Sequence, residues 1–389
     1  MELNPKLSSQ FADEVYAVQD DIDLKGFLLR PEFSTKNADK KKLTAKVGGH
    51  IIRSATDGFG VCALGSGDYS NDIFIIFRGS TTANNSADWV SNFKIGTEIS
   101  ETGFAVHVGF NNIFKSMKSD ILTFLNQNNS RTGNIHCIGH SLGGAIATIA
   151  ADWVQSIRKT QEVKLYTFGA PKPAMMFFSS HFTRSIGERN IKRVFKATDP
   201  VPMIPLFPFV HPPFQSSGHY ISSSESILSA QAHDMKEYCN SVKDLTWQDL
   251  KRRQPTHTLD EIIEEFLKSK SPIDSSSAKT WQLLNSALIW VFKKAGSGIF
   301  HALQLPLIGF MSLADKLAYL LSKIKDIKFP TWDGSVWLFR LIAKMMQALG
   351  MAVVKNIKEM TIVLIRNVIY RLMQKTTEVA RKAIYGIGK

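Results

Sequence analysis

Short apolar runs recur through the first 200 residues, and each ends in a polar or glycine-containing turn. The runs at 72–77 (DIFIIF), 135–138 (IHCI), 164–169 (KLYTFG) and 193–198 (RVFKAT) predict buried strands. The second run leads through one short turn into residues 144–154, whose small and apolar side chains predict a helix. The pattern therefore predicts a strand, a sharp turn and a helix in direct succession around residue 141.

The last third of the chain has a different pattern. Residues 258–267 predict a helix that closes a first domain, and the Ser- and Lys-rich residues 268–279 predict a polar linker. Residues 335–384 contain no proline and carry basic residues at helical spacing between aliphatic ones, which predicts one or two amphipathic helices. We therefore expect a first domain at 1–267, the linker, and an all-helical, basic amphipathic domain at 280–389.

The distribution of charge agrees with a division into two domains. The net charge is +13, and the residues from Lys279 onward hold 17 Lys plus Arg against 5 Asp plus Glu, a net +12. Four of the seven Trp also lie there. Basic residues and interfacial Trp beside an apolar face suit an anionic membrane surface. A packed helical bundle and a protein partner are the alternatives. No nucleic-acid partner is expected, because large aliphatic residues separate the basic ones.

Two further segments carry predictions. Residues 295–314 have no charged residue before Asp315 and would be long enough to cross a bilayer, but they contain Gly296, Gly298 and Pro306. We therefore expect a buried or membrane-inserting hairpin there. Residues 36–46, which include three consecutive lysines, predict an exposed basic loop.

The predicted turn at residue 141 contains a candidate catalytic serine. Gly139-His140-Ser141-Leu142-Gly143 has the G-x-S-x-G spacing in which glycines let the backbone turn tightly beneath a serine. A serine hydroxyl becomes a nucleophile when a neighbouring base takes its proton and a carboxylate orients that base. The backbone N–H of Leu142, at the start of the predicted helix, would face the negative charge that develops on an attacked carbonyl oxygen.

The other strand ends offer partners for this serine. The first run ends at Arg78-Gly79-Ser80, where the Ser80 N–H could be a second donor to an oxyanion. The last run leads into Asp199-Pro200, a carboxylate held by a proline-rich turn. A histidine must then follow, and the candidates are His211, His219, His233 and His257.

At these residues the sequence resembles the class 3 (fungal-type) lipases of the α/β-hydrolase fold, in particular their bacterial members. The matching segments occur in the family's order: FRGS (77–80), ADWVSNF (87–93), VHVGF (106–110), IGHSLGGAIA (138–147), TFGAPKPA (167–174) and KATDPVPMIP (196–205). The resemblance covers about residues 45–245. It implies an α/β-hydrolase fold with a mostly parallel central sheet.

The resemblance also implies roles. It implies a catalytic triad of Ser141, Asp199 and a histidine, an oxyanion hole at Ser80 and Leu142, and a lid around Trp89. The family's histidine precedes a tyrosine by a short spacer, a pattern that His233 and Tyr238 fit. His219 is the alternative base, because the interval from Asp199 to His233 is shorter than in the fungal members.

The cysteines, the motif spacing and the first residues bear on cofactors and on location. Three dispersed cysteines form no disulfide framework, and no metal-ligand or nucleotide-binding spacing occurs, so neither metal nor cofactor is expected. The first residues lack the pattern of a cleavable secretory signal. We therefore expect synthesis in the cytoplasm without a cleavable signal, with export by a specialised secretion system and peripheral membrane association as extensions of this hypothesis.

Two functions follow as hypotheses. The first is a serine esterase on lipid substrates, most simply a phospholipase A or lipase acting at membranes, and in one version an exported antibacterial or host-directed effector with an inhibitory or chaperone partner. The second is a membrane-perturbing or scaffolding protein that acts through its basic amphipathic tail.

Overall fold

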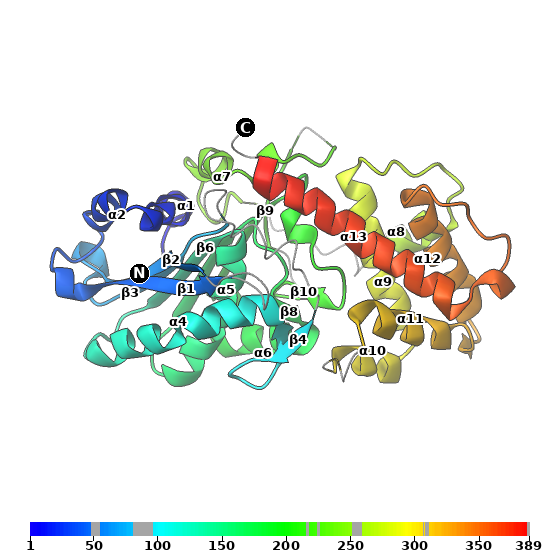
Figure 1. The fold of residues 1–389 in the computed structure, drawn as a ribbon, viewed down its shortest axis with the longest axis horizontal. Coiled ribbons are helices and arrows are strands. Elements are labelled where there is room, and N and C mark those ends of the chain that lie inside the picture. The colour runs from blue at the N-terminus through cyan, green and yellow to red at the C-terminus, as the bar shows by residue number, and fades with distance from the viewer. Residues whose placement is uncertain are drawn as a thin grey trace.

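The computed structural model describes residues 1–47, 55–80, 96–214, 218–223, 226–250, 259–305, 307 and 311–386. A seven-stranded sheet forms its centre (Figure 1). The strands lie in the order β1 (Lys40–Val47), β2 (Ala55–Leu64), β3 (Ile73–Phe77), β6 (Ile135–His140), β7 (Val163–Phe168), β9 (Ile191–Lys196) and β11 (His219–Ile221). The pairs from β3 to β11 are parallel, whereas β1 and β2 are antiparallel to their neighbours.

Both faces of this sheet are buried, as its apolar strands predict. Along β3, Ile73, Ile75 and Phe77 enter one core, whereas Phe74 and Ile76 enter the other. The first core also contains side chains of α4 (Val108–Gln127), α5 (Leu142–Ile157) and α6 (Met176–Ile186). The second contains side chains of α1 (Pro5–Glu14), α2 (Asp21–Leu28) and α7 (Met235–Val242). Period-2 alternation thus places helices on both faces of the sheet.

Beside the main sheet lies a small one of four short strands. Their order is β10 (Phe209–Val210), β8 (Ala174–Met175), β5 (Ala105–His107) and β4 (Thr97–Ile99). Together with the serine-bearing turn described below, the parallel sheet with helices on both faces has the architecture of an α/β-hydrolase. All four predicted strands are present, and the predicted helix at 144–154 lies within α5.

The prediction of an exposed basic loop at 36–46 is wrong. A short 3₁₀ turn at Asn37–Asp39 leads into β1, which pairs with β2. Leu43 and Ala45 are buried, and the lysines of this edge strand lie at the margins of both faces: Lys41 pairs with Asp120 of α4 (3.5 Å) and Lys42 with Asp21 of α2 (2.9 Å). Lysine on an edge strand is a common protection against unwanted pairing, which explains the lysine run without a loop.

The C-terminal third is helical. It contains α8 (Asp260–Lys268), α9 (Ala278–Lys294), α10 (Ser297–Gln304), α11 (Leu313–Ile324), α12 (Gly334–Ala348) and α13 (Ile362–Gly386). A two-stranded hairpin, β12 (Lys328–Phe329) and β13 (Trp332–Asp333), joins α11 to α12. The predicted amphipathic stretch at 335–384 therefore forms two helices, α12 and α13. In the described part of the chain, no helix combines the length and the apolar character needed to cross a bilayer.

These helices share a core with the loops of the sheet domain. Leu206, Phe207 and Phe209 pack in one cluster with side chains of α8 to α13. Polar contacts add to the junction: the Gln282 side chain donates to the Ala197 carbonyl (3.2 Å), and the Met176 N–H donates to Gln304 (2.8 Å). Most apolar residues of α12 and α13 are thus covered by protein. That a first domain ends at residue 267 and a second begins at residue 280 stays a prediction.

A buried carboxyl group lies in α5, three turns beyond its start. Asp152 is 2% exposed and accepts a hydrogen bond from the Thr102 hydroxyl. His181 Nε2 lies 3.8 Å from the other carboxyl oxygen, and burial lowers the pKa of this histidine. Burial raises the pKa of Asp152 to about 7, although the bond from Thr102 acts in the opposite direction.

Asp152 should make the protein less stable as the pH rises from about 4 to about 7. In this window the folded protein keeps a proton that the unfolded chain has released, so the free energy of unfolding falls by about 1.4 kcal/mol per pH unit. Asp152→Asn should remove this slope, as measured by urea unfolding at pH 5, 6, 7 and 8. Asp244→Asn, at an exposed position, should retain it. Equal slopes in wild type and Asp152→Asn would contradict the assignment.

Candidate active site

Ser141 lies at the sharp turn between β6 and α5. It is the one residue other than glycine with a positive φ among those described, at φ 53° and ψ −129°. The turn is possible because Gly143 packs directly on the end of β3. A Cβ at Gly143 would lie 2.5 Å from the Arg78 carbonyl oxygen and closer still to that of Phe77. Backbone strain of this kind holds the serine side chain out of the turn.

The side chains of three residues far apart in sequence meet at this turn. His233 Nε2 lies 2.8 Å from Ser141 Oγ, and His233 Nδ1 lies 2.9 Å from Asp199 Oδ2. Both bonds are buried, since Ser141 and His233 are 2% exposed and Asp199 is fully buried. Because a carboxylate only accepts, Nδ1 carries the proton, and Nε2 is free to accept the serine proton. This is the geometry that activates a hydroxyl for attack on a carbonyl carbon.

The carboxylate of Asp199 is fixed by three donors. Besides His233, the Tyr238 hydroxyl donates to Oδ2 (2.8 Å) and the Val201 N–H donates to Oδ1 (2.9 Å). Burial and the neighbouring carboxylate raise the pKa of Tyr238 well above its usual value, so this hydroxyl stays protonated and remains a donor. Gly169, at φ +54°, passes so close that a Cβ there would lie 2.7 Å from Asp199 Oδ2.

A second histidine holds the backbone of the first. His140 Nε2 donates to the His233 carbonyl (2.9 Å), so its Nδ1 accepts from the Tyr16 hydroxyl (2.8 Å). Burial, together with the neighbouring His233, lowers the pKa of His140 well below the usual value. His140 is therefore a neutral ring. Its place in the motif gave no indication of this bond to His233.

The residues expected to supply the oxyanion hole lie next to Ser141 in sequence or in space. Leu142 is the first residue of α5, and the first N–H groups of a helix have no partner within it. Gly79 lies against Ser141, because a Cβ there would come within 3.1 Å of the Ser141 Cβ. The fully buried Arg78 donates to the carbonyls of Gly79 and Gly58, each at 2.7 Å. Since the peptide is planar, a fixed Gly79 carbonyl also fixes the direction of the Ser80 N–H.

Arg78 is a residue whose role the sequence did not reveal. Its position in the FRGS motif did not indicate which groups the side chain contacts. A buried guanidinium is uncommon, because removing the charge from water is unfavourable unless acceptors surround it. The two carbonyls, and the Phe59 ring beneath the guanidinium at 4.9 Å, supply that environment. No signal in the sequence identifies these carbonyls in advance.

The other candidate residues lie elsewhere. His219 is on the edge strand β11, where its ring packs on Trp247 (centroids 5.0 Å apart) and Nδ1 lies 3.4 Å from the Leu250 carbonyl. His211 Nε2 donates to the Pro202 carbonyl (2.8 Å). His257 and the expected lid residue Trp89 lie outside the described residues. Of the histidines that the structure describes, His233 is therefore the one bonded to Ser141.

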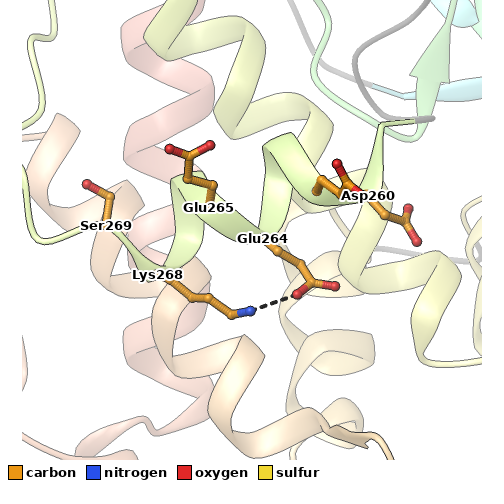
Figure 2. A pocket seen from close by; sticks show the side chains of 6 residues that line it. Asp260, Glu264, Glu265, Lys268 and Ser269 are labelled. Carbon is orange, nitrogen blue, oxygen red and sulfur yellow. Dashed lines mark hydrogen bonds and ion pairs between the residues drawn. The ribbon is translucent and has the colours of Figure 1, made fainter.

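A surface pocket along α8 lies apart from this site. Figure 2 shows its lining, which is mostly acidic: Asp260, Glu261, Glu264, Glu265, Lys268 and Ser269. Lys268 pairs with Glu264 (2.8 Å), and Asp260 pairs with Lys294 (2.7 Å). No group of three or more His, Cys, Asp or Glu suited to a metal ion occurs within the described ranges. The pocket is a solvated acidic helix face.

Comparison with known proteins agrees with the geometry. Residues 74–209 match the family model of lipase (class 3). This segment is similar in sequence to class 3 lipases. The matched residues include the Ser80 turn, the Ser141 turn and Asp199. His233 and the C-terminal helices lie outside them. The matched segment therefore contains Ser141 and Asp199 of the three hydrogen-bonded residues described above.

The curated relatives are fungal. The chain is 30% identical over 172 residues to the secreted mono- and diacylglycerol lipase 1 of Fusarium solani, covering 43% of this chain and 49% of the relative. It is 29% identical over 188 residues to the secreted mono- and diacylglycerol lipase A of Penicillium cyclopium, covering 46% and 57%. The chain thus spans about half the length of the curated relatives it matches. The expected bacterial membership stays a prediction.

Solved structures of lipases are also similar in part. An MDLA variant from Penicillium cyclopium has a TM-score of 0.41 at 20% identity, over 59% of this chain and 83% of that one. The triacylglyceride lipase of Rhizomucor miehei has a TM-score of 0.38 at 21% identity, over 57% and 78%.

These relatives correct one prediction. We expected synthesis in the cytoplasm without a cleavable signal, with specialised export and peripheral membrane association as extensions. The curated relatives are secreted lipases, and this finding overturns the expectation. The reasoning failed because the absence of a recognisable leader pattern is weak evidence about where a lipase segment of this kind works.

The close packing at the serine turn can be tested by adding one methyl group. Gly143→Ala should destabilise the protein by about 1–3 kcal/mol or prevent folding, because the new Cβ meets backbone carbonyls that cannot move independently. Gly26→Ala in α2 is the matched control. Nothing lies within 4 Å of a Cβ there, so the change should stabilise by about 0.5–1 kcal/mol. Thermal unfolding measures both, and a Gly143→Ala protein as stable as wild type would refute the packing argument.

Proposed function

We propose that this protein is a serine-dependent hydrolase of lipid esters. The observation that carries the proposal is the pair of buried hydrogen bonds that links Ser141 Oγ to His233 and His233 to Asp199. The class 3 lipase match over residues 74–209 supports the same conclusion from sequence.

The proposed roles follow from the atoms. Ser141 Oγ attacks the ester carbonyl carbon while His233 Nε2 takes its proton. Asp199 accepts from Nδ1–H and stabilises the imidazolium that forms. The N–H groups of Leu142 and Ser80 bind the carbonyl oxygen as it becomes an oxyanion. The alcohol leaves with the proton from His233, and water then repeats the sequence on the acyl-enzyme and releases the fatty acid.

We propose acylglycerols as the first substrate class, since the curated relatives act on mono- and diacylglycerols. Phospholipids at an anionic surface are the second class, and the net +12 of the C-terminal third favours them. A tail that acts alone as a membrane-perturbing element has less support, because its apolar side chains are largely buried in the shared core. An effector role and an inhibitory or chaperone partner stay predictions.

Substitutions at the site test the mechanism. Ser141→Ala and His233→Ala should each lower kcat for short-chain nitrophenyl esters by about 10⁴-fold or more, because the nucleophile or its base is lost. His219→Ala should retain kcat within about threefold, because this ring packs at the far edge of the sheet. Circular dichroism checks that each variant is folded. If His219→Ala loses activity and His233→Ala keeps it, the assignment of the base is wrong.

Lipid turnover separates the two substrate classes. Purified protein is incubated with diacylglycerol emulsions, neutral phosphatidylcholine vesicles and vesicles that contain anionic phosphatidylglycerol, with Ser141→Ala as the blank. Fatty acid released mainly from diacylglycerol supports the first class. Release mainly from anionic vesicles, lost in high salt because surface charges are screened, supports the second. Release from none of the three would contradict a lipid-ester substrate.

A further inference from the structure

The last helix of the chain reaches the active site. In Figure 1, α13 is the long red helix that runs from the helical region, beside α11 and α12, towards α7 and β9. Its first half enters the core of the helical region through Ile365, Ile369 and Leu372. Arg366 also pairs with Asp315 of α11. The helix is therefore anchored at one end among the C-terminal helices.

The second half of α13 packs on two short 3₁₀ turns of the lipase-like part. The small side chains Ala380 and Ala383 form a separate apolar cluster with Val201, Ile204 and, at its edge, Ala230. Both alanines are at most 1% exposed. Alanines three residues apart lie on the same helix face and allow a helix to approach its neighbour closely.

Asp199 lies two residues before the first of these turns, and His233 is the last residue of the second. Val201 begins the turn at Val201–Met203 and donates its N–H to Asp199 Oδ1 at 2.9 Å. Ala230 precedes the turn at Gln231–His233, and its carbonyl accepts the His233 N–H at 3.0 Å. The residues that touch α13 are thus hydrogen-bonded directly to the aspartate and the histidine. A shift of the helix would move both backbones.

Backbone contacts tie the two turns together beneath the helix. The Ser229 N–H donates to the Thr198 carbonyl at 3.0 Å, and the Leu228 N–H donates to the Ser276 carbonyl at 3.2 Å. Ser276 belongs to the stretch 268–279, which the sequence predicted as a polar linker. On the side of α13, Thr376 and Val379 line a small cavity with Pro200 and Met203.

We propose that α13 is a positioning element of the active site: through Ala380 and Ala383 it holds the Asp199 and His233 turns at hydrogen-bonding distance. This inference rests on the proposed hydrolase function for its kinetic readout. The physical reason is that neither turn belongs to a strand, so the packing of Ala380 and Ala383, together with the Ser229–Thr198 backbone hydrogen bond, maintains the separation of the turns. A misplacement of about 1 Å in such a pair can reduce turnover about 100-fold.

The test enlarges one alanine in the full-length chain. Ala383→Leu should push α13 from the turns, and Gln374→Leu, which adds the same side chain to the exposed face of the helix, is the control. We expect kcat to fall about 10–100-fold in Ala383→Leu with KM within twofold, and no change in the control. Val201→Ala added to Ala383→Leu restores the packed volume and should recover most of the loss.

A proton NMR signal separates positioning from simple destabilisation. The Nδ1 proton of a histidine bonded to a buried carboxylate resonates far downfield, and Asp199→Asn identifies it by its loss. We expect this signal to shift or vanish in Ala383→Leu at a temperature where circular dichroism shows a folded protein. If Ala383→Leu does not fold, Ala380→Gly, which loosens the same contact, takes its place with the same expectations.

The outcomes decide between the two proposals. A folded Ala383→Leu or Ala380→Gly protein with wild-type kcat and an unchanged downfield signal overturns the role of α13. A double variant that recovers neither kcat nor the signal also counts against it. If the wild type shows the signal and cleaves no ester, the proposed function fails, and the signal in the variants still decides the role of α13.

Discussion

The buried hydrogen bond between His233 and Asp199 is the contact on which the site depends. The two residues lie on separate loops, 34 positions apart, and neither belongs to a strand. Their bond is useful only if the carboxylate is held in one orientation, and Tyr238 and Val201 supply the remaining donors. Because all four groups are buried, loss of any one donor leaves a polar atom without compensation from water.

The serine side of the site is built differently. Ser141 is held by the regular sheet, through a strained turn between β6 and α5 that glycines make possible. Arg78 extends this rigid part by fixing the peptide next to Ser80. Ser141 and the proposed oxyanion donors thus lie at the ends of central strands, whereas His233 and Asp199 lie on loops that pack against α13.

Much of this architecture could be predicted from the sequence. The four apolar runs and the G-x-S-x-G turn are local signals, because strand, turn and helix follow within 20 residues, and the structure has all of them. Asp199 and His233 could be named as candidates from their motifs. Their meeting could not be derived from local pattern, since it depends on long loops that carry no periodicity. Arg78 was missed because its partners are backbone carbonyls, which leave no trace in side-chain identity.

The C-terminal helices show what a sequence pattern alone does not predict. The spacing of apolar and basic residues predicted amphipathic helices, and α12 and α13 have that character. Periodicity identifies a face that must be covered but not what covers it. Here the cover is largely the rest of the chain: Trp281, Leu288 and Trp290 of α9 share one core with Phe207 and Phe209 of the sheet domain. The alanines at 380 and 383 gave no signal in the sequence, because small residues are common in any helix.

The neutral ring of His140 has a consequence for proton transfer. It lies with its centroid 4.7 Å from that of His233, close enough for two imidazolium rings to repel each other strongly. His140 is buried, which lowers its pKa, and its single N–H donates to the His233 carbonyl. The ring is therefore neutral and adds no positive charge to the site. In the proposed mechanism, His233 becomes a cation when it accepts the serine proton, and this cation would face the Asp199 carboxylate without a second charged imidazole beside it.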